Sequence, residues 1–224
     1  MPLTHLTGSR VRALVVLALV ACAALVTCQL LGVAIGAIIS KLVASTAFLA
    51  VAIHSGAARS RYGRTVFLGL ICAWCGDMFL LGDSQGLFLA GLVSFLLGHV
   101  AYVAAFWRHG QSYRWSLSAL LPVAAISFLV SAWLAPFLPP DMVIPVRVYT
   151  FIISLMVMTA FGARGAGSTA LIPAGAALFY LSDLSVATMQ FTEPEFPTYI
   201  WGLPFYYTGQ LMLALSVASA NRKE

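Results

Sequence analysis

The chain is a succession of long apolar stretches separated by short polar breaks. Each stretch runs for about 20 residues without period-two alternation, which is typical of α-helices that cross a bilayer. Turn-forming or charged residues mark the breaks, for example at positions 59–64, 139–141 and 193–195. The pattern predicts eight membrane-spanning helices, at residues 11–32, 36–57, 65–82, 86–107, 116–138, 143–163, 170–191 and 200–219.

The composition of the 224 residues supports this prediction. Hydrophobic residues make up 61% of the chain and charged residues only 8%, against about 25% charged in ordinary soluble domains. Disordered chains need the opposite balance, and a soluble globule needs more charge on its surface. Only helix bundles and closed barrels satisfy the backbone in lipid, and the missing alternation excludes a barrel. We therefore expect an all-α polytopic membrane bundle, forming one integral membrane domain over residues 1–224.

The basic residues predict the orientation of this bundle. Apart from Lys41 and Arg147, the cations lie at the N-terminus, in every second connection and in the tail, namely at Arg10, Arg12, Arg59, Arg61, Arg64, Arg108, Arg114, Arg164, Arg222 and Lys223. The intervening connections carry acids only, at Asp83, Asp141, Glu193 and Glu195. This bias predicts that both termini are cytoplasmic. We expect the protein to lie in the cytoplasmic (inner) membrane of a bacterium. Topology thus explains the net charge of +5 without a nucleic-acid partner, and the basic loops could meet anionic membrane lipids.

Four charged residues fall inside the predicted spans: Lys41, Asp77, Arg147 and Asp183. Ionisable groups in a bilayer are costly unless they are paired or hydrated, so each marks either a functional site or an ion pair that holds helices together. With a rise of ~1.5 Å per residue, all four could lie in one layer of the outer half of the membrane. The sequence therefore predicts one polar cavity that collects two cations and two carboxylates.

The spacing of these charges suggests an internal repeat. Lys41 precedes Asp77 by 36 residues, and Arg147 precedes Asp183 by the same number. The two pairs are offset by 106 residues, which maps the second and third spans onto the sixth and seventh. Because each half would hold four spans, the halves would share one orientation. We therefore expect two parallel four-helix repeats.

Three further polar residues could reach the same cavity. His99 shares a helix face with apolar and aromatic neighbours, so it could orient an aspartate or a headgroup, or be a hydrogen-bonded packing histidine. Tyr207 and Gln210 are three residues apart on the last span. They could contact a substrate, or they could form hydrogen bonds between helices.

The segments around these charges resemble the lysoplasmalogenase family, the YhhN-like membrane proteins. The matching stretches are residues 76–81 (GDMFLL), 91–102 (GLVSFLLGHVAY), 145–149 (PVRVY), 175–183 (GAALFYLSD) and 206–210 (YYTGQ). Their order and spacing agree from Lys41 onward. One departure is Leu42, where the family often has proline after the lysine.

This resemblance implies an eight-span integral membrane hydrolase. Its substrates would be lysoplasmalogens, lysophospholipids with a vinyl ether that is cleaved to a fatty aldehyde and glycerophospho-ethanolamine or -choline. The two essential carboxylates of the family match Asp77 and Asp183. The substrate partner is then a lysophospholipid, and neither a metal nor another cofactor is implied.

The residue types suit that chemistry. Cleavage of a vinyl ether needs an acid to protonate the β-carbon, and a second carboxylate to stabilise the oxocarbenium ion and activate water. Asp77 and Asp183 could fill these roles in either order, while Lys41 and Arg147 could hold the substrate phosphate or keep one aspartate ionised. A small-molecule or proton-coupled transporter is the alternative that buried charges and a parallel repeat also suit. A structural or lipid-binding protein with ion-paired helices is a third.

Overall fold

The computed structural model describes residues 8–220, so the predicted cytoplasmic tail with Arg222 and Lys223 lies outside the described residues. Within this range the chain is helical and contains no strand. Its eight long helices are α1 (Ser9–Leu30), α2 (Ala34–His54), α3 (Arg61–Phe79), α4 (Gln85–Arg108), α5 (Tyr113–Leu134), α6 (Val143–Gly165), α7 (Leu171–Phe191) and α8 (Tyr199–Ala220). Two short 3₁₀ turns, η2 (Ala57–Arg59) and η3 (Ala135–Phe137), complete the structure. The predicted all-α class is confirmed.

Each predicted span corresponds to one helix, with ends that differ by at most four residues. Local chemistry explains several of these ends. The hydroxyls of Ser60 and Ser84 cap α3 and α4 by accepting hydrogen bonds from backbone N–H groups in the first turn. Gly32, in the turn between α1 and α2, has a φ of +69°, a conformation that glycine adopts without strain.

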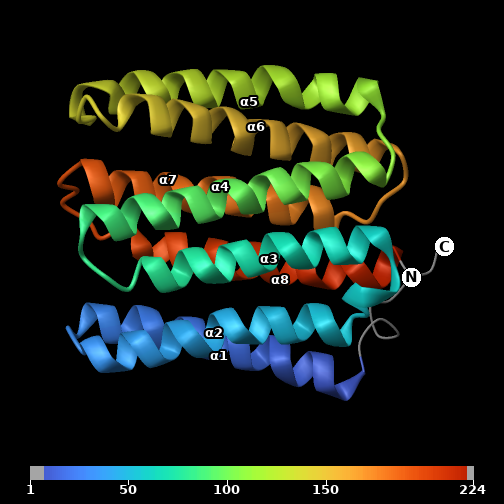
Figure 1. Cartoon of the computed structure of the whole chain (residues 1–224), viewed down its shortest axis with the longest axis horizontal. Helices are drawn as coiled ribbons and strands as arrows, with labels where there is room; N and C mark the ends of the chain where they lie inside the picture. Colours follow the sequence, from blue (N-terminus) through green and yellow to red (C-terminus); the bar gives the residue numbers. More distant parts are fainter. Residues whose placement is uncertain (1–7, 221–224) are drawn as a thin grey trace.

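The helices run up and down and form a flattened bundle (Figure 1). The pairs α5/α6 and α1/α2 lie at its two edges, and α4, α7, α3 and α8 lie between them. The start of α1 and the end of α8 lie at one end, together with the arginine-rich connections, and we call this the basic end. The connections with Asp83, Asp141, Glu193 and Glu195 lie at the opposite, acidic end.

Within the described residues, six helices are long and apolar enough to cross a membrane: α1, α2, α4, α5, α6 and α7. The helices α3 and α8, with 19 and 22 residues, are not among these six. Both lie in the middle of the bundle and carry predicted site residues, a position in which a helix contacts protein more than lipid. That they cross the membrane as well stays a prediction.

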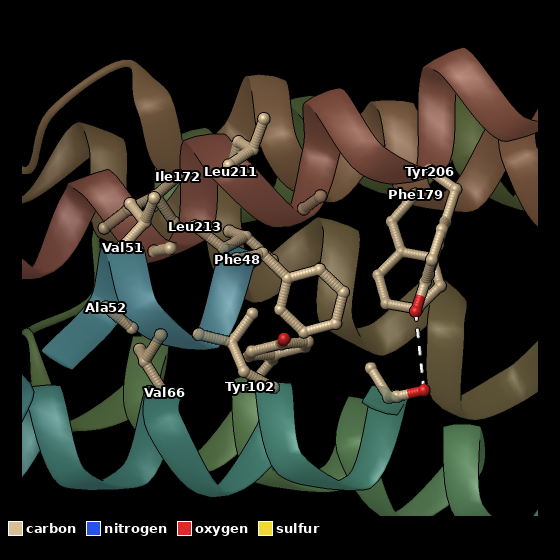
Figure 2. Close-up of a cluster of buried hydrophobic side chains, with 14 of the residues drawn as sticks. Phe48, Val51, Ala52, Val66, Tyr102, Ile172, Phe179, Tyr206, Leu211 and Leu213 are labelled. Atoms are coloured by element: carbon tan, nitrogen blue, oxygen red, sulfur yellow. Dashed lines mark hydrogen bonds between the residues drawn. The ribbon is translucent and has the colours of Figure 1, made fainter. Parts of the chain in front are cut away.

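Aromatic side chains fill the centre of the bundle (Figure 2). Phe48, Tyr102 and Phe179 are almost wholly buried, and the ring of Phe179 lies beside that of Tyr206 with centroids 5.4 Å apart. Glycine lets α3 approach this cluster, because a Cβ on Gly76 would lie 2.6 Å from the ring of Phe95. By contrast α5 is largely exposed and apolar, as expected of a helix that faces lipid.

Candidate active site

A cavity of about 360 Å³ lies in the half of the bundle nearer the acidic end. All eight long helices contribute to its wall, and most of the lining residues are apolar or aromatic. Its charged lining residues are Lys41, Asp77 and Asp183. The volume is within the range of ordinary ligand sites. The structure therefore brings both predicted carboxylates and one predicted cation to a single cavity.

Asp77 lies near the end of α3 and is almost completely buried, at 4% exposure. Its Oδ2 accepts a hydrogen bond of 2.6 Å from the hydroxyl of Ser45 on α2 and one of 2.8 Å from the hydroxyl of Tyr206 on α8. Its other oxygen, Oδ1, makes no hydrogen bond to any described residue. One oxygen of the carboxyl group is thus held by protein, and the other is left for a ligand.

Asp183 on α7 is held in the same way by a different pair of groups. Its Oδ2 accepts a hydrogen bond of 2.7 Å from the hydroxyl of Tyr149 on α6, and it lies 3.2 Å from Nε2 of His99 on α4. The Asp183 side chain is 16% exposed, while His99 is fully buried. As at Asp77, no described residue forms a hydrogen bond with Oδ1.

The two ring nitrogens of His99 have different surroundings. Its Nδ1 is buried without a hydrogen-bond partner among the described residues, next to the rings of Tyr149 and Phe179. Its Nε2 lies 2.9 Å from the hydroxyl of Tyr149 and 3.2 Å from Oδ2 of Asp183. His99, Tyr149 and Asp183 therefore form one hydrogen-bonded group.

The two aspartates have equivalent partners in the two halves of the chain. Asp77 is on the third helix of the first half and receives hydrogen bonds from the second helix of that half and the last helix of the other. Asp183 is on the third helix of the second half and is contacted by α6, the second helix of that half, and by α4, the last helix of the first half. This matching pattern of contacts between the two halves agrees with a parallel two-fold repeat, which stays a prediction.

The other predicted residues lie in different places. Lys41 lines the cavity and makes no hydrogen bond or ion pair with residues 8–220, although its charge acts on Asp77. Arg147 is exposed and does not line the cavity. It precedes Tyr149 by two residues, a rotation of about 200° around a helix, so when Tyr149 points inward Arg147 points outward.

Tyr207 and Gln210 are fully buried behind the cavity wall. The hydroxyl of Tyr207 lies 3.1 Å from that of Ser45, and Oε1 of Gln210 accepts a hydrogen bond of 2.7 Å from Tyr102. Both therefore form hydrogen bonds between helices, which is one of the two alternatives that the sequence left open.

Three partners of the carboxylates, Ser45, Tyr149 and Tyr206, were not among the predicted site residues. Two of them are close in sequence to a predicted cation, since Ser45 follows Lys41 by four residues and Tyr149 follows Arg147 by two. The four-residue spacing puts Ser45 on the same helix face as Lys41, which is the pattern that could have identified it. Tyr206, next to the predicted Tyr207, is the residue of that pair that reaches Asp77.

The fold and the cavity define an integral membrane helix bundle in which one buried and one partly buried carboxylate line the same pocket. Comparison with known proteins identifies the family. The model of the YhhN family matches residues 36–217, and the chain therefore belongs to this family. This match covers both carboxylates and all of their hydrogen-bond partners. No solved structure was found to match the chain.

Named relatives occur among mammalian proteins. The human protein named lysoplasmalogenase TMEM86A is 34% identical over 162 residues, which cover 70% of this chain and 66% of the human protein. The pig protein named lysoplasmalogenase TMEM86B is 30% identical over 155 residues, covering 68% of this chain and 63% of the pig protein. The aligned region thus spans slightly less than two thirds of these relatives.

Proposed function

We propose that this protein hydrolyses the vinyl ether bond of lysoplasmalogens. The observation that carries the proposal is a pair of carboxylates on one cavity, Asp77 buried and Asp183 partly buried, each held through Oδ2 and each without a hydrogen bond from a described residue to Oδ1. The names of the mammalian relatives support the same substrate class. The apolar lining suits a lipid, because an alkenyl chain can be buried there without unpaired polar groups.

The reaction needs one acid and one carboxylate. The acid protonates the β-carbon of the vinyl ether, and the double-bond electrons form that C–H bond, which leaves an oxocarbenium ion. Water adds to the cationic carbon and gives up a proton to the carboxylate, forming a hemiacetal. Its collapse breaks the C–O bond and gives a fatty aldehyde and a glycerol hydroxyl, so the net change is the addition of one water molecule.

Asp77 and Asp183 supply these two groups in this proposal. A carboxyl group that is kept from water can retain its proton near neutral pH, while the second carboxylate stabilises the cation. Ser45 and Tyr206 position Asp77, and Tyr149 and His99 position Asp183. Lys41, whose ammonium has no partner among the described residues, would bind the phosphate.

The placement of the cavity also bears on the alternative of a transporter. A transporter needs a route that opens alternately to both sides of the membrane. The residues that line this cavity lie in the acidic half of the bundle, and none lies near the basic end. We therefore favour the hydrolase. We further propose that the acidic end faces outward from a bacterial cytoplasmic (inner) membrane and that both termini are cytoplasmic.

The test is aldehyde release by the purified protein in detergent. The substrate is 1-alkenyl-lysophosphoethanolamine, and the 1-acyl and 1-alkyl lysophospholipids of equal chain length serve as controls. We expect aldehyde and glycerophosphoethanolamine in equal amounts from the alkenyl substrate and no cleavage of the alkyl ether. Absence of aldehyde would refute the proposed activity. Equal turnover of the acyl ester would show a general lysophospholipase instead.

A further inference from the structure

Three hydroxyl groups meet where α5, α6 and α7 come together. The hydroxyl of Ser127 on α5 lies 2.8 Å from that of Ser154 on α6 and 2.8 Å from that of Tyr180 on α7. We call these three residues the hydroxyl cluster. Tyr180 also lines the cavity, so the cluster borders the cavity and shows which side of α7 faces α5.

From the hydroxyl cluster toward the acidic end, each of the three helices presents a row of residues to the cavity. The rows continue from the cluster residues at steps of three or four positions, so their members lie on the same side of each helix as the cluster. All members line the cavity, and they are Val130 and Leu134 on α5, Thr150 and Val146 on α6, and Leu184 and Ala187 on α7. We call the space between these rows the α5–α7 groove.

The α5–α7 groove offers no polar group that lacks a partner. Thr150 is the only row residue with a polar side chain, and its hydroxyl donates to the carbonyl of Val146 within α6. The cluster hydroxyls can form a continuous series, because that of Ser154 donates to the carbonyl of Thr150 and can accept from Ser127, which can accept from Tyr180. A hydrocarbon can therefore occupy the groove without leaving buried polar groups unpaired.

The α5–α7 groove begins beside one of the two carboxylates. Asp183 lies on α7 between Tyr180 and Leu184, and its partner Tyr149 lies on α6 next to the row of that helix. Lys41 belongs to α2, whose pair with α1 forms the edge of the bundle opposite to α5 and α6 (Figure 1). The cavity thus has its cation on one side and the apolar groove on the other, with Asp183 at the border of the groove.

A lysoplasmalogen has its groups in the matching order. Its phosphate is followed by the glycerol, the vinyl ether and the hydrocarbon chain, and the chain starts at the β-carbon of the vinyl ether. A vinyl ether that reaches Asp183 while the phosphate is at Lys41 therefore starts its chain at the groove. The lining residues of α5, α6 and α7 all lie between the hydroxyl cluster and the acidic end, so the cluster closes the inner end of the groove.

We propose that the α5–α7 groove binds the hydrocarbon chain of the substrate and that the hydroxyl cluster forms its inner end. The inference rests on the proposed function for the substrate class. Apolar contacts are not directional, so the groove accepts alkenyl, alkyl and acyl chains alike. In this arrangement the groove recognises the chain, while the carboxylates select the vinyl ether.

The first experiment narrows the groove and varies the length of the chain. Val130→Trp places a bulky ring in the groove from α5, far from the carboxylate partners, and the substrates are lysophosphoethanolamines with a hexadec-1-enyl or a but-1-enyl chain. We expect kcat/KM for the long chain to fall about tenfold or more, because crowding a filled site costs about as much as overpacking a core. The value for the short chain should stay within about twofold, because that chain ends close to the vinyl ether.

The matched control is Leu129→Trp, which adds the same ring one position away. Leu129 is 65% exposed and does not line the cavity, so both substrates should be cleaved as by the wild type. Thermal unfolding checks that both variants fold. If Val130→Trp lowers kcat/KM equally for the two chain lengths, or for neither, the proposed chain site is overturned.

Photo-cross-linking of the wild-type protein tests the site without relying on turnover or on a variant that folds. The probe is a 1-alkyl lysophosphoethanolamine with a diazirine in its chain, and an excess of the same lipid without the diazirine identifies specific labelling by competition. Mass spectrometry should find the competed label on the row residues of α5, α6 and α7. Competed label found only on other helices, or no competed label, would overturn the chain site even if aldehyde is released. If no aldehyde is released but the groove is labelled, the hydrolase fails and the chain site stands.

Discussion

The neighbouring residues Tyr206 and Tyr207 allow a sharp test of how Asp77 is positioned. Both tyrosines are buried on α8, but only the hydroxyl of Tyr206 contacts Asp77, at 2.8 Å, whereas that of Tyr207 lies 3.1 Å from the hydroxyl of Ser45. The substitutions Tyr206→Phe and Tyr207→Phe each remove one hydroxyl and keep the ring that packs in the core. The two variants therefore differ in which hydrogen bond is lost.

The two variants should therefore lose different amounts of activity. A hydrogen bond to a charged acceptor contributes about 1.5–3 kcal/mol, so Tyr206→Phe should lower kcat roughly ten- to hundredfold. A hydrogen bond between neutral hydroxyls contributes about 0.5–1.5 kcal/mol, and Ser45 still donates to Asp77 when Tyr207 is phenylalanine. Tyr207→Phe should therefore cost only a few-fold.

The assay is the initial rate of aldehyde release at saturating 1-alkenyl-lysophosphoethanolamine, with thermal unfolding as a check that both variants fold. The reasoning is refuted if Tyr207→Phe loses as much activity as Tyr206→Phe. It is also refuted if Tyr206→Phe keeps more than half of the wild-type kcat.

Three further predictions follow from the same geometry. Lys41→Met should raise KM about tenfold in steady-state kinetics, because it removes the proposed phosphate contact. Arg147→Met should change KM by no more than about twofold, because Arg147 is exposed outside the cavity, and equal effects of the two variants would contradict this prediction. Gly76→Ala should lower the free energy of unfolding, measured by denaturation in detergent, by about 1–3 kcal/mol, because its Cβ would lie 2.6 Å from Phe95. The control is Gly86→Ala, whose Cβ would meet no atom within 4 Å and which should not destabilise the protein. Hydrolysis in D₂O should place one deuterium on the carbon next to the aldehyde, as mass spectrometry would show, and its absence would exclude protonation at the β-carbon.

The fold was predictable from the sequence because membrane helices are specified by local properties. Apolar length, turn residues and basic connections act over a few positions, so the eight helices were placed to within a turn or so. Ionisable residues inside apolar stretches are equally visible, and three of the four line the cavity. These features need no knowledge of how the helices pack.

The contacts of the site were less predictable because they depend on how each helix is rotated. The equal 36-residue spacings suggested that Arg147 would match Lys41, yet Lys41 faces the cavity and Arg147 is exposed. Successive residues are rotated by about 100° around a helix, so the rotation of the helix about its axis decides which of them face the cavity. Hydropathy alone does not define this rotation when a helix is apolar on most of its sides. Ser45 had only its four-residue spacing from Lys41 as a signal in the sequence, and Tyr149 became recognisable only when a neighbouring helix placed its hydroxyl against Asp183.

The central claim is that Asp77 and Asp183 together cleave a vinyl ether. The most direct measurement is aldehyde release from 1-alkenyl-lysophosphoethanolamine by the purified wild-type protein and by Asp77→Asn and Asp183→Asn, each of which keeps the size of the side chain. Removing either the acid or the stabilising carboxylate should lower kcat by a factor of about 10² or more, while the variants stay folded. Wild-type activity in either variant would contradict the account.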